Sequence, residues 1–260
     1  MRKNGGYFRA DVKRSLVSMK LITAILLTVA VLLLATLEGI ALNTDVYYIF
    51  SLVMYGMPAM IVLICAAIPY ADSFCEDIEK RYIYKQAIRG DIKMYVSARV
   101  LSIFLSAVIT VSLGLLIYVI LLSTGLEWID KEELQTNLTE KNNALGFLLR
   151  QGWYILYYFC YGIWYGILGG ILALWASYLS LHISNRMLTL AAPMIIYYFT
   201  DFLLVKLFQG RIDLSVIFSP ANSLFSNAFL SILTAAGIAI VNLLFLRWIL
   251  FRKLRRKINE

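Results

Sequence analysis

The sequence has few of the residues that most often build metal and catalytic sites. It contains one histidine, His182, and three cysteines, Cys65, Cys75 and Cys160, whose spacings show no paired pattern. A structural zinc site takes four histidine or cysteine ligands, and a disulfide framework needs cysteines in recurring pairs. The sequence therefore indicates neither a metal centre nor a disulfide scaffold.

A nucleotide-binding loop is also missing. No segment matches G-x-x-x-x-G-K-[ST], in which backbone N–H groups and a lysine hold nucleotide phosphates. The adjacent Gly169 and Gly170 have no lysine beside them. We expect no catalytic residue, no ATP hydrolysis and no bound cofactor in this chain.

Charge is scarce, and apolar residues fill the chain in long runs. Only 15% of the residues are charged, 61% are hydrophobic, and the mean hydropathy is +0.76. Leu21–Leu37 and Val46–Ala71 contain no charge. A helix needs about 20 apolar residues to cross a bilayer, and lipid leaves the backbone no other hydrogen-bonding partner than its own helix. The sequence therefore predicts an all-α membrane protein.

Six transmembrane helices are expected within one transmembrane domain over residues 1–260. Their approximate bounds are 20–42, 47–70, 97–122, 153–180, 187–208 and 229–250. A cytoplasmic loop over 72–96, an extracellular loop over 123–151 and a short re-entrant element over 209–228 complete the predicted domain. Six positive charges precede the first run and no small-residue cleavage site follows it, so we expect a retained span and not a signal peptide.

The distribution of basic residues predicts the orientation. Nineteen of the 24 Lys and Arg residues lie on one side when both termini are placed together. Short cytoplasmic segments carry the excess of Lys and Arg. We therefore expect a multi-pass protein of the plasma (inner) membrane with cytoplasmic N- and C-termini. Anionic lipid accounts for the net charge of +8, and no nucleic-acid partner is needed.

The N-terminal tail has a helical pattern. Phe8, Val12, Leu16 and Met19 recur at helical spacing, which predicts an amphipathic helix in the inner interface. A basic anchor with no further role is the alternative.

The segment Phe74–Tyr95 concentrates nine charged residues between two apolar runs. It predicts a short helix from Asp72 to Arg89, a stop at Gly90 and a new helix leading into the third span. Exposed tyrosine and isoleucine among paired charges are typical of a docking surface. A solvated loop that only sets topology is the alternative.

This arrangement resembles the membrane subunit, or permease, of a type-2 ABC exporter. The shared features are six spans, an amphipathic entry helix, a charged helix between spans two and three, and an apolar element before span six. The segment FSPANSLF, at 218–225, is similar to the family's element before the last span.

A local pattern carries the resemblance in the charged segment. The family often shows E-x-G-T, a basic-apolar helix, P-x-S-R and then a lysine that opens span three. Glu79 matches the glutamate, Tyr82 stands at the threonine position, and Arg81 replaces the glycine. Arg89-Gly90 stands near the place of P-x-S-R, and the next helix is flanked by the basic residues Lys93 and Arg99.

The resemblance implies that the charged helix is a coupling helix, which seats in a separate ATPase. It implies two cytoplasmic ABC ATPase subunits, which bind ATP and Mg, and a second membrane subunit in a homodimer or heterodimer. The expected ATPase-coupling residues are Glu76, Asp77, Glu79, Lys80, Arg81, Tyr82, Lys85, Gln86 and Arg89.

A substrate path is expected along spans two and five. Methionine and aromatic stripes adapt to varied apolar ligands, although such stripes also serve ordinary packing. The candidate residues are Phe50, Met54, Met57, Ile61, Tyr197, Tyr198 and Asp201. Pro58 is able to kink span two, and Asp201 is expected either to line a wet cavity or to reach the outer interface.

The fourth span is the most aromatic. Gly162, Gly166 and Gly170 recur every four residues, which predicts a close helix contact. We interpret this helix as a packing element and not as part of the path.

The sequence thus predicts an exporter subunit for a peptide, lipid or drug of amphipathic or hydrophobic character, and more narrowly a small peptide-toxin or antimicrobial-peptide exporter. A non-transporting membrane scaffold or immunity protein is one alternative, and a secondary transporter is another.

Overall fold

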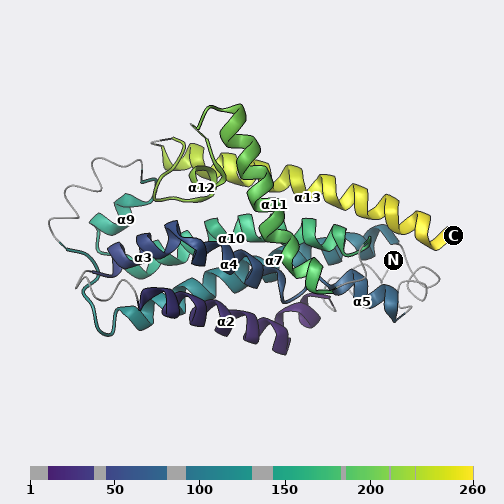
Figure 1. The fold of residues 1–260 in the computed structure, drawn as a ribbon, viewed down its shortest axis with the longest axis horizontal. Coiled ribbons are helices and arrows are strands. Elements are labelled where there is room, and N and C mark those ends of the chain that lie inside the picture. Colours follow the sequence, from purple (N-terminus) through teal and green to yellow (C-terminus); the bar gives the residue numbers. More distant parts are fainter. Residues whose placement is uncertain are drawn as a thin grey trace, which may run out of the picture.

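The computed structural model describes residues 11–37, 45–80, 92–130, 143–182, 186–210, 212–225 and 227–259. Across these ranges the chain is helical and contains no strand, as expected for an all-α protein (Figure 1). Five helices are long and apolar enough to cross a membrane: α2 (Met19–Thr36), α7 (Ile92–Leu122), α10 (Tyr154–Leu179), α11 (Arg186–Leu207) and α13 (Ala228–Asn259).

The region predicted as a continuous span over 47–70 is broken into two helices. Helix α3 (Val46–Tyr55) and helix α4 (Met57–Ala67) meet at Gly56 with a bend of 75°. Pro58 lies in the first turn of α4, where its missing N–H group costs no hydrogen bond. The pair counts as a sixth span only if both halves together cross the bilayer.

Shorter helices lie between the long ones: α5 (Ser73–Glu79), α9 (Gly146–Arg150) and α12 (Leu214–Phe218). Helix α7 begins inside the segment predicted as a loop over 72–96, and α13 continues beyond the predicted end of its span at 250. Of the predicted N-terminal helix, residues 11–16 form a helical segment, whereas Phe8 lies outside the described residues. Met19, expected on the apolar face that lies in the membrane interface, is 80% exposed.

The contact between α7 and α10 forms the centre of the molecule. All three glycines of the predicted stripe lie against α7. A Cβ atom at Gly162 would lie 2.8 Å from Cα of Ser112, and one at Gly166 would lie 3.0 Å from the carbonyl oxygen of Val108. At Gly170, an added Cβ would lie 2.6 Å from the ring of Phe104. Because glycine has no side chain, the two helices can approach until their backbones are in contact.

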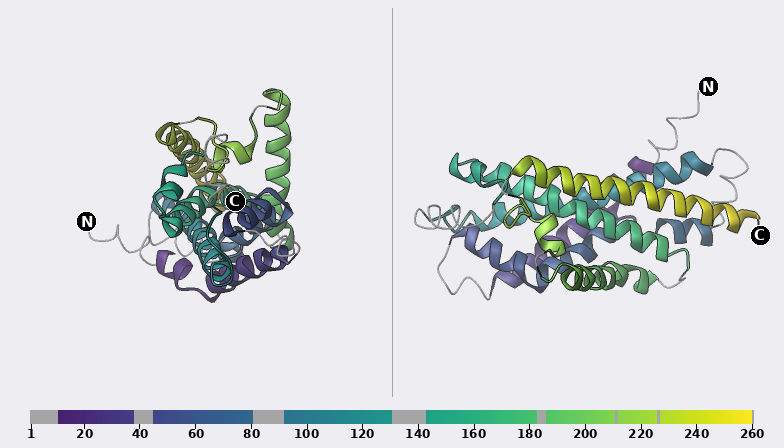
Figure 2. Two further views of the ribbon diagram at one scale, coloured as in Figure 1. Left: turned by 90° about the vertical axis from the view of Figure 1, so that its left-hand side faces the viewer. Right: turned by 90° about the horizontal axis from the view of Figure 1, so that it is seen from above.

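Helix α11 departs from the direction of the other long helices. Figures 1 and 2 show that it crosses the bundle steeply and that its C-terminal half stands away from α7 and α10. Most of its apolar side chains are correspondingly exposed, among them Met187, Phe199 and Leu207. In a membrane protein, such a surface is suited to lipid or to another membrane helix.

The glycine contact yields a stability prediction. Replacing Gly162 by Ala places a methyl group within 2.8 Å of the α7 backbone, which cannot rotate away. We expect Gly162→Ala to destabilise the fold by about 1–3 kcal/mol, the usual cost of overpacking. Thermal unfolding of the purified protein in detergent measures this loss.

Gly237→Ala in α13 is the matched control, because an added Cβ there meets no atom within 4 Å. Alanine forms helices better than glycine by about 1 kcal/mol, so this variant is expected to unfold at the same temperature or a higher one. Equal destabilisation of the two variants would contradict the close contact.

Candidate functional site

Two features gather polar side chains, and they lie toward opposite ends of the bundle. One lies around α5, near the C-terminus of α13, and the other lies between α3 and α12 (Figure 1). The first is a network of charges and the second is a cavity.

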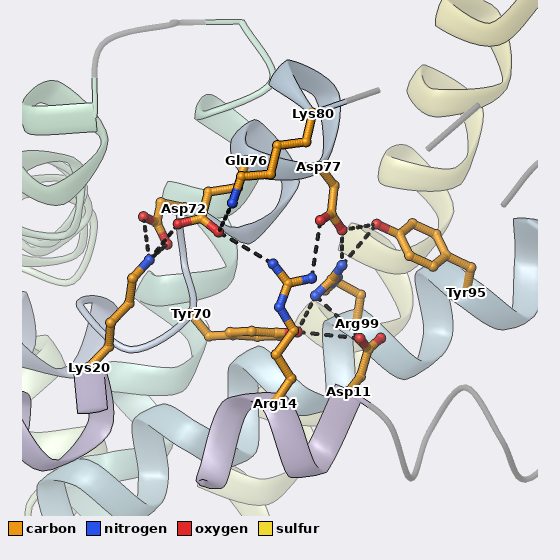
Figure 3. Close-up of polar contacts among 10 residues, drawn as sticks. All are labelled: Asp11, Arg14, Lys20, Tyr70, Asp72, Glu76, Asp77, Lys80, Tyr95 and Arg99. Carbon is orange, nitrogen blue, oxygen red and sulfur yellow. Dashed lines mark hydrogen bonds and ion pairs between the residues drawn. The ribbon is translucent and has the colours of Figure 1, made fainter. Parts of the chain in front are cut away.

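The charge network joins α5 to the N-terminal segment and to the start of α7 (Figure 3). We call it the ionic cluster; its members are Asp11, Arg14, Lys20, Tyr70, Asp72, Glu76, Asp77, Lys80, Tyr95 and Arg99. Four carboxylates face four cationic side chains, so the formal charges cancel. The cluster thereby fastens parts of the chain that are up to about 90 positions apart in sequence.

Arg99 occupies the buried side of the cluster, with no exposed surface. Its guanidinium forms ion pairs with Asp77 and, over 3.3 Å between Nη1 and Oδ1, with Asp11. It also donates hydrogen bonds to the hydroxyl groups of Tyr70 and Tyr95, and its Cζ lies 5.0 Å and 5.2 Å from their ring centroids. A buried charge is tolerated only when it is paired and hydrogen-bonded. Arg99 meets both conditions through Nη1 and Nη2, whereas its buried Nε has no partner among the described residues.

Arg14 and Lys20 lie on the solvent-exposed side of the ionic cluster. Nη1 of Arg14 lies 3.2 Å from Oδ1 of Asp77, and its Nη2 lies 3.3 Å from Oε2 of Glu76. Nζ of Lys20 lies 2.6 Å from Oε1 of Glu76 and 3.0 Å from Oδ2 of Asp72. Both cationic side chains are more than two-fifths exposed, so water screens these pairs and each contributes less than the pair of Arg99 with Asp77.

The cluster shifts the pKa values of its members. Burial alone would raise the pKa of Glu76, but the hydrogen bond and charge of Lys20 lower it below the ordinary 4.5. Burial raises the pKa of Tyr70 to about 12, so its hydroxyl keeps the proton that it donates to Asp11 over 3.3 Å. Burial also raises the pKa of Asp11, against the opposing charge of Arg99.

Part of the segment that was predicted to dock an ATPase belongs to the ionic cluster. Asp77 is 1% exposed and Glu76 points into the cluster, so both acids serve contacts within the chain. Glu79 and Lys80 are exposed. Five further coupling residues of the prediction lie outside the described residues: Arg81, Tyr82, Lys85, Gln86 and Arg89.

These internal partners were not among the predictions made from the sequence. Arg99 was interpreted as a basic residue flanking span three and Lys20 as a topological charge. One signal was available, because Arg99 lies inside an apolar helix, where a guanidinium needs carboxylate partners. Beyond Asp91, the acidic residues that precede Arg99 along the chain are those of 72–79.

The second feature is a cavity of about 250 Å³ among α3, α4, α10, α11 and α12. We call it the tyrosine cavity; its lining consists of Tyr47, Phe50, Ser51, Met54, Tyr55, Gly56, Ala59, Met60, Tyr157, Tyr161, Tyr165, Tyr197, Asp201, Asp213, Ser215, Ser219, Ala221 and Asn222. The structure thus brings together four residues of the predicted substrate path: Phe50, Met54, Tyr197 and Asp201. The other three, Met57, Ile61 and Tyr198, are exposed and do not line it.

Span four contributes to this cavity as well as to packing. Tyr157, Tyr161 and Tyr165 follow one another at four-residue steps and face α3 and α12, on the side next to the glycine stripe. The hydroxyl of Tyr165 donates to the carbonyl of Ala59 over 2.9 Å, and the hydroxyl oxygens of Tyr161 and Ser219 lie 3.2 Å apart. Span four therefore both packs closely against α7 and lines the cavity.

Two carboxylates close the cavity on the side of α11 and α12. Asp213 caps α12, because its Oδ1 accepts the N–H of Val216 over 2.7 Å. Asp201 holds the start of the same helix by accepting the N–H of Leu214 over 2.9 Å. Asp201 thus lines a cavity, and the alternative that the tilt of its helix brings it to the outer interface stays a prediction.

The chain was compared with protein-family models, with curated proteins and with solved structures. None of the three comparisons finds a match. The residues themselves therefore carry the functional argument.

Removal of the buried guanidinium tests the ionic cluster. Arg99→Leu leaves the buried Asp77 with only the partly exposed Arg14 as its cation, and the loss of its buried partner is expected to cost up to about 3–5 kcal/mol of stability. The double variant Arg99→Leu/Asp77→Leu removes both charges and is expected to unfold at a higher temperature than Arg99→Leu. Thermal unfolding in detergent measures both, with Lys80→Leu as the exposed control, expected to cost about 0–1 kcal/mol. The single variant Asp77→Leu completes the cycle, and a double variant that loses the sum of the two single losses would show that the groups are not coupled.

The lowered pKa of Glu76 predicts a pH dependence. The folded-state pKa lies below that of the unfolded chain, so the stabilisation by this carboxylate is complete above about pH 4.5 and is lost as the pH falls through the folded-state pKa. The difference in unfolding free energy between the wild type and Glu76→Gln should therefore be largest near neutral pH and shrink on acidification. Chemical denaturation across a pH series measures it, and the exposed Glu127→Gln serves as control. A difference that is constant across the series would exclude this linkage.

Proposed function

We propose that this chain is the membrane subunit of an ATP-driven ABC exporter, which works with a second membrane subunit and with ATPase subunits in trans. Its cargo is an amphipathic or hydrophobic molecule. The proposal rests on the resemblance of the sequence, and the observation that carries it is the tyrosine cavity.

The cavity supports transport because separate predictions converge in it. Phe50 and Met54 come from the broken span two, and Tyr197 and Asp201 come from α11. A concave, mostly apolar site with a few polar groups is the usual form of a small-molecule binding site. The 75° break between α3 and α4 borders the cavity, since Gly56 belongs to its lining. Movement of either half at that break would change the shape of the site.

The ionic cluster supports coupling to a partner at the other end. Helix α5 is tied to α7 through Asp77 and Arg99, and to α2 through Glu76 and Lys20. A force on the exposed Glu79 and Lys80 would therefore pass to two long helices together. Coupling requires contacts that differ between two states of the complex. The ion pairs of Arg14 and Lys20 are screened by water, so they are the contacts of the ionic cluster that break at least cost.

A secondary transporter is the second candidate, because two carboxylates line the cavity. Carboxylates within membrane segments often serve ion- or proton-coupled transport. The two candidates differ in their source of energy, which one experiment separates.

The experiment is purification of the tagged chain from its native membranes in mild detergent, followed by ATP hydrolysis and export assays in proteoliposomes. We expect a co-purifying protein with a phosphate-binding loop and ATP-dependent export of an amphipathic substrate. Glu79→Ala and Tyr82→Ala should reduce the bound ATPase and the export at least about fivefold, since each removes an expected contact of the docking helix.

Glu127→Ala, an exposed acid of the loop after α7, is the control and should retain both activities. Assembly and export that survive both coupling variants would refute the coupling assignment. Export driven by a proton gradient, with no ATPase bound, would replace the exporter by the secondary transporter.

A further inference from the structure

We infer that the tyrosine cavity binds an organic cation, namely a protonated or quaternary amine attached to a small apolar body. Its role as the cargo site rests on the proposed export function, whereas the binding itself rests on the walls of the cavity alone.

The walls present aromatic rings on several sides. Seven aromatic side chains line the cavity, six of them tyrosines: Tyr47, Phe50, Tyr55, Tyr157, Tyr161, Tyr165 and Tyr197. The rings meet at steep angles: the centroid of Phe50 lies 4.8 Å from that of Tyr161, with 86° between their planes. Such an arrangement turns ring faces and edges in different directions around one space. A cation is attracted to ring faces, by up to about 2 kcal/mol or more where water is excluded.

The charged side chains that line the cavity are all negative. Asp201 and Asp213 are its only charged members. In the part of the chain that the structure describes, their hydrogen-bond partners are neutral groups: the N–H groups of Leu214 and Val216 and the hydroxyl of Ser215. Neutral donors orient a carboxylate without cancelling its charge, so the lining favours a positive occupant.

A groove at the opposite end of the molecule provides an internal comparison. Its walls, formed by the start of α7 and the end of α13, carry five cationic side chains and no carboxylate: Lys93, Arg247, Arg252, Arg255 and Arg256. Its aromatic residues are already engaged by these cations, since Cζ of Arg252 lies 3.9 Å from the ring centroid of Trp248. The tyrosine cavity has rings and carboxylates but no cation of its own in the lining.

The volume limits the size of the occupant. Sites for drug-sized ligands usually measure about 300–1,000 Å³, and the cavity holds about 250 Å³. It therefore accepts one ring-sized apolar body with its charged group. Tyr55 is 72% exposed and Asn222 also lines the cavity, with Nδ2 of Asn222 3.5 Å from the hydroxyl of Tyr55. This pair marks the mouth, through which the remainder of a longer molecule would extend.

The test is direct binding to the full chain, purified without an ATPase and placed in nanodiscs of zwitterionic lipid. The probe is phenyltrimethylammonium, and the comparison ligand is tert-butylbenzene, which has the same shape without the charge. Saturation-transfer NMR titrations give the two dissociation constants, with empty nanodiscs as the blank. We expect the cation to bind at least about tenfold more tightly than its neutral counterpart, as for a cation near a carboxylate and aromatic rings.

Isosteric variants separate charge from structure. Asn caps a helix as well as Asp does, so Asp213→Asn should preserve α12, and Asp201→Asn keeps an oxygen that accepts the N–H of Leu214. Each is expected to weaken cation binding about fivefold or more while leaving the neutral ligand unaffected. Glu127→Gln removes one exposed carboxylate outside the cavity and should change neither constant.

The rings are tested at Tyr161. Tyr161→Phe keeps the ring and should bind the cation within about twofold of the wild type, whereas Tyr161→Leu should lose about fivefold. Equal binding of cation and neutral ligand, or binding unchanged in both Asp variants, would overturn the inference. Cation binding by a chain that brings down no ATPase from its native membranes would leave the cation site standing and reject the exporter. An ATPase that co-purifies and drives export, together with no preference for the cation, would reject the cation site and leave the exporter standing.

Discussion

Arg99 carries a full positive charge in a position from which solvent is excluded. The desolvation of such a group costs several kcal/mol, so ion pairs and hydrogen bonds with the surrounding residues must offset that cost. Its partners come from three separate places: Asp77 on α5, Tyr70 after α4, and Asp11 in the N-terminal segment. One buried guanidinium therefore fixes where three segments meet α7. The positions of α5 and of the turn that precedes it follow from this requirement.

A second constraint acts through α10. Gly162 and Tyr161 are neighbours in sequence, and neighbours on a helix point about 100° apart. Repeated every four residues, this offset produces two adjacent stripes. The glycine stripe lies against α7 at backbone distance, so the tyrosine stripe must face α3 and α12, where the cavity is. Close packing and the aromatic cavity are two consequences of the same helix register.

Periodicity and charge in the sequence predict the all-helical class and the long helices, because apolar runs of membrane length have few alternatives in lipid. They also indicate Phe50, Met54, Tyr197 and Asp201, which do meet. They did not predict that Asp77 and Arg99 pair, since a charged residue near a span looks the same whether it faces water or a buried partner. The steep path of α11 is likewise invisible to hydropathy, which measures how apolar a helix is and not how it is tilted.

Outside the ionic cluster, charged side chains are unevenly distributed along the bundle. The four acids and four bases of that cluster neutralise one another, so they leave no surplus charge at their end of the bundle. Among the described residues, positive charge gathers there at the end of α13 and the start of α7, whose groove is lined by five cationic groups. The tyrosine cavity toward the other end carries two carboxylates. A cationic ligand is therefore drawn to the cavity and repelled by the groove, and this polarity along the bundle is a property of the chain itself, independent of any partner.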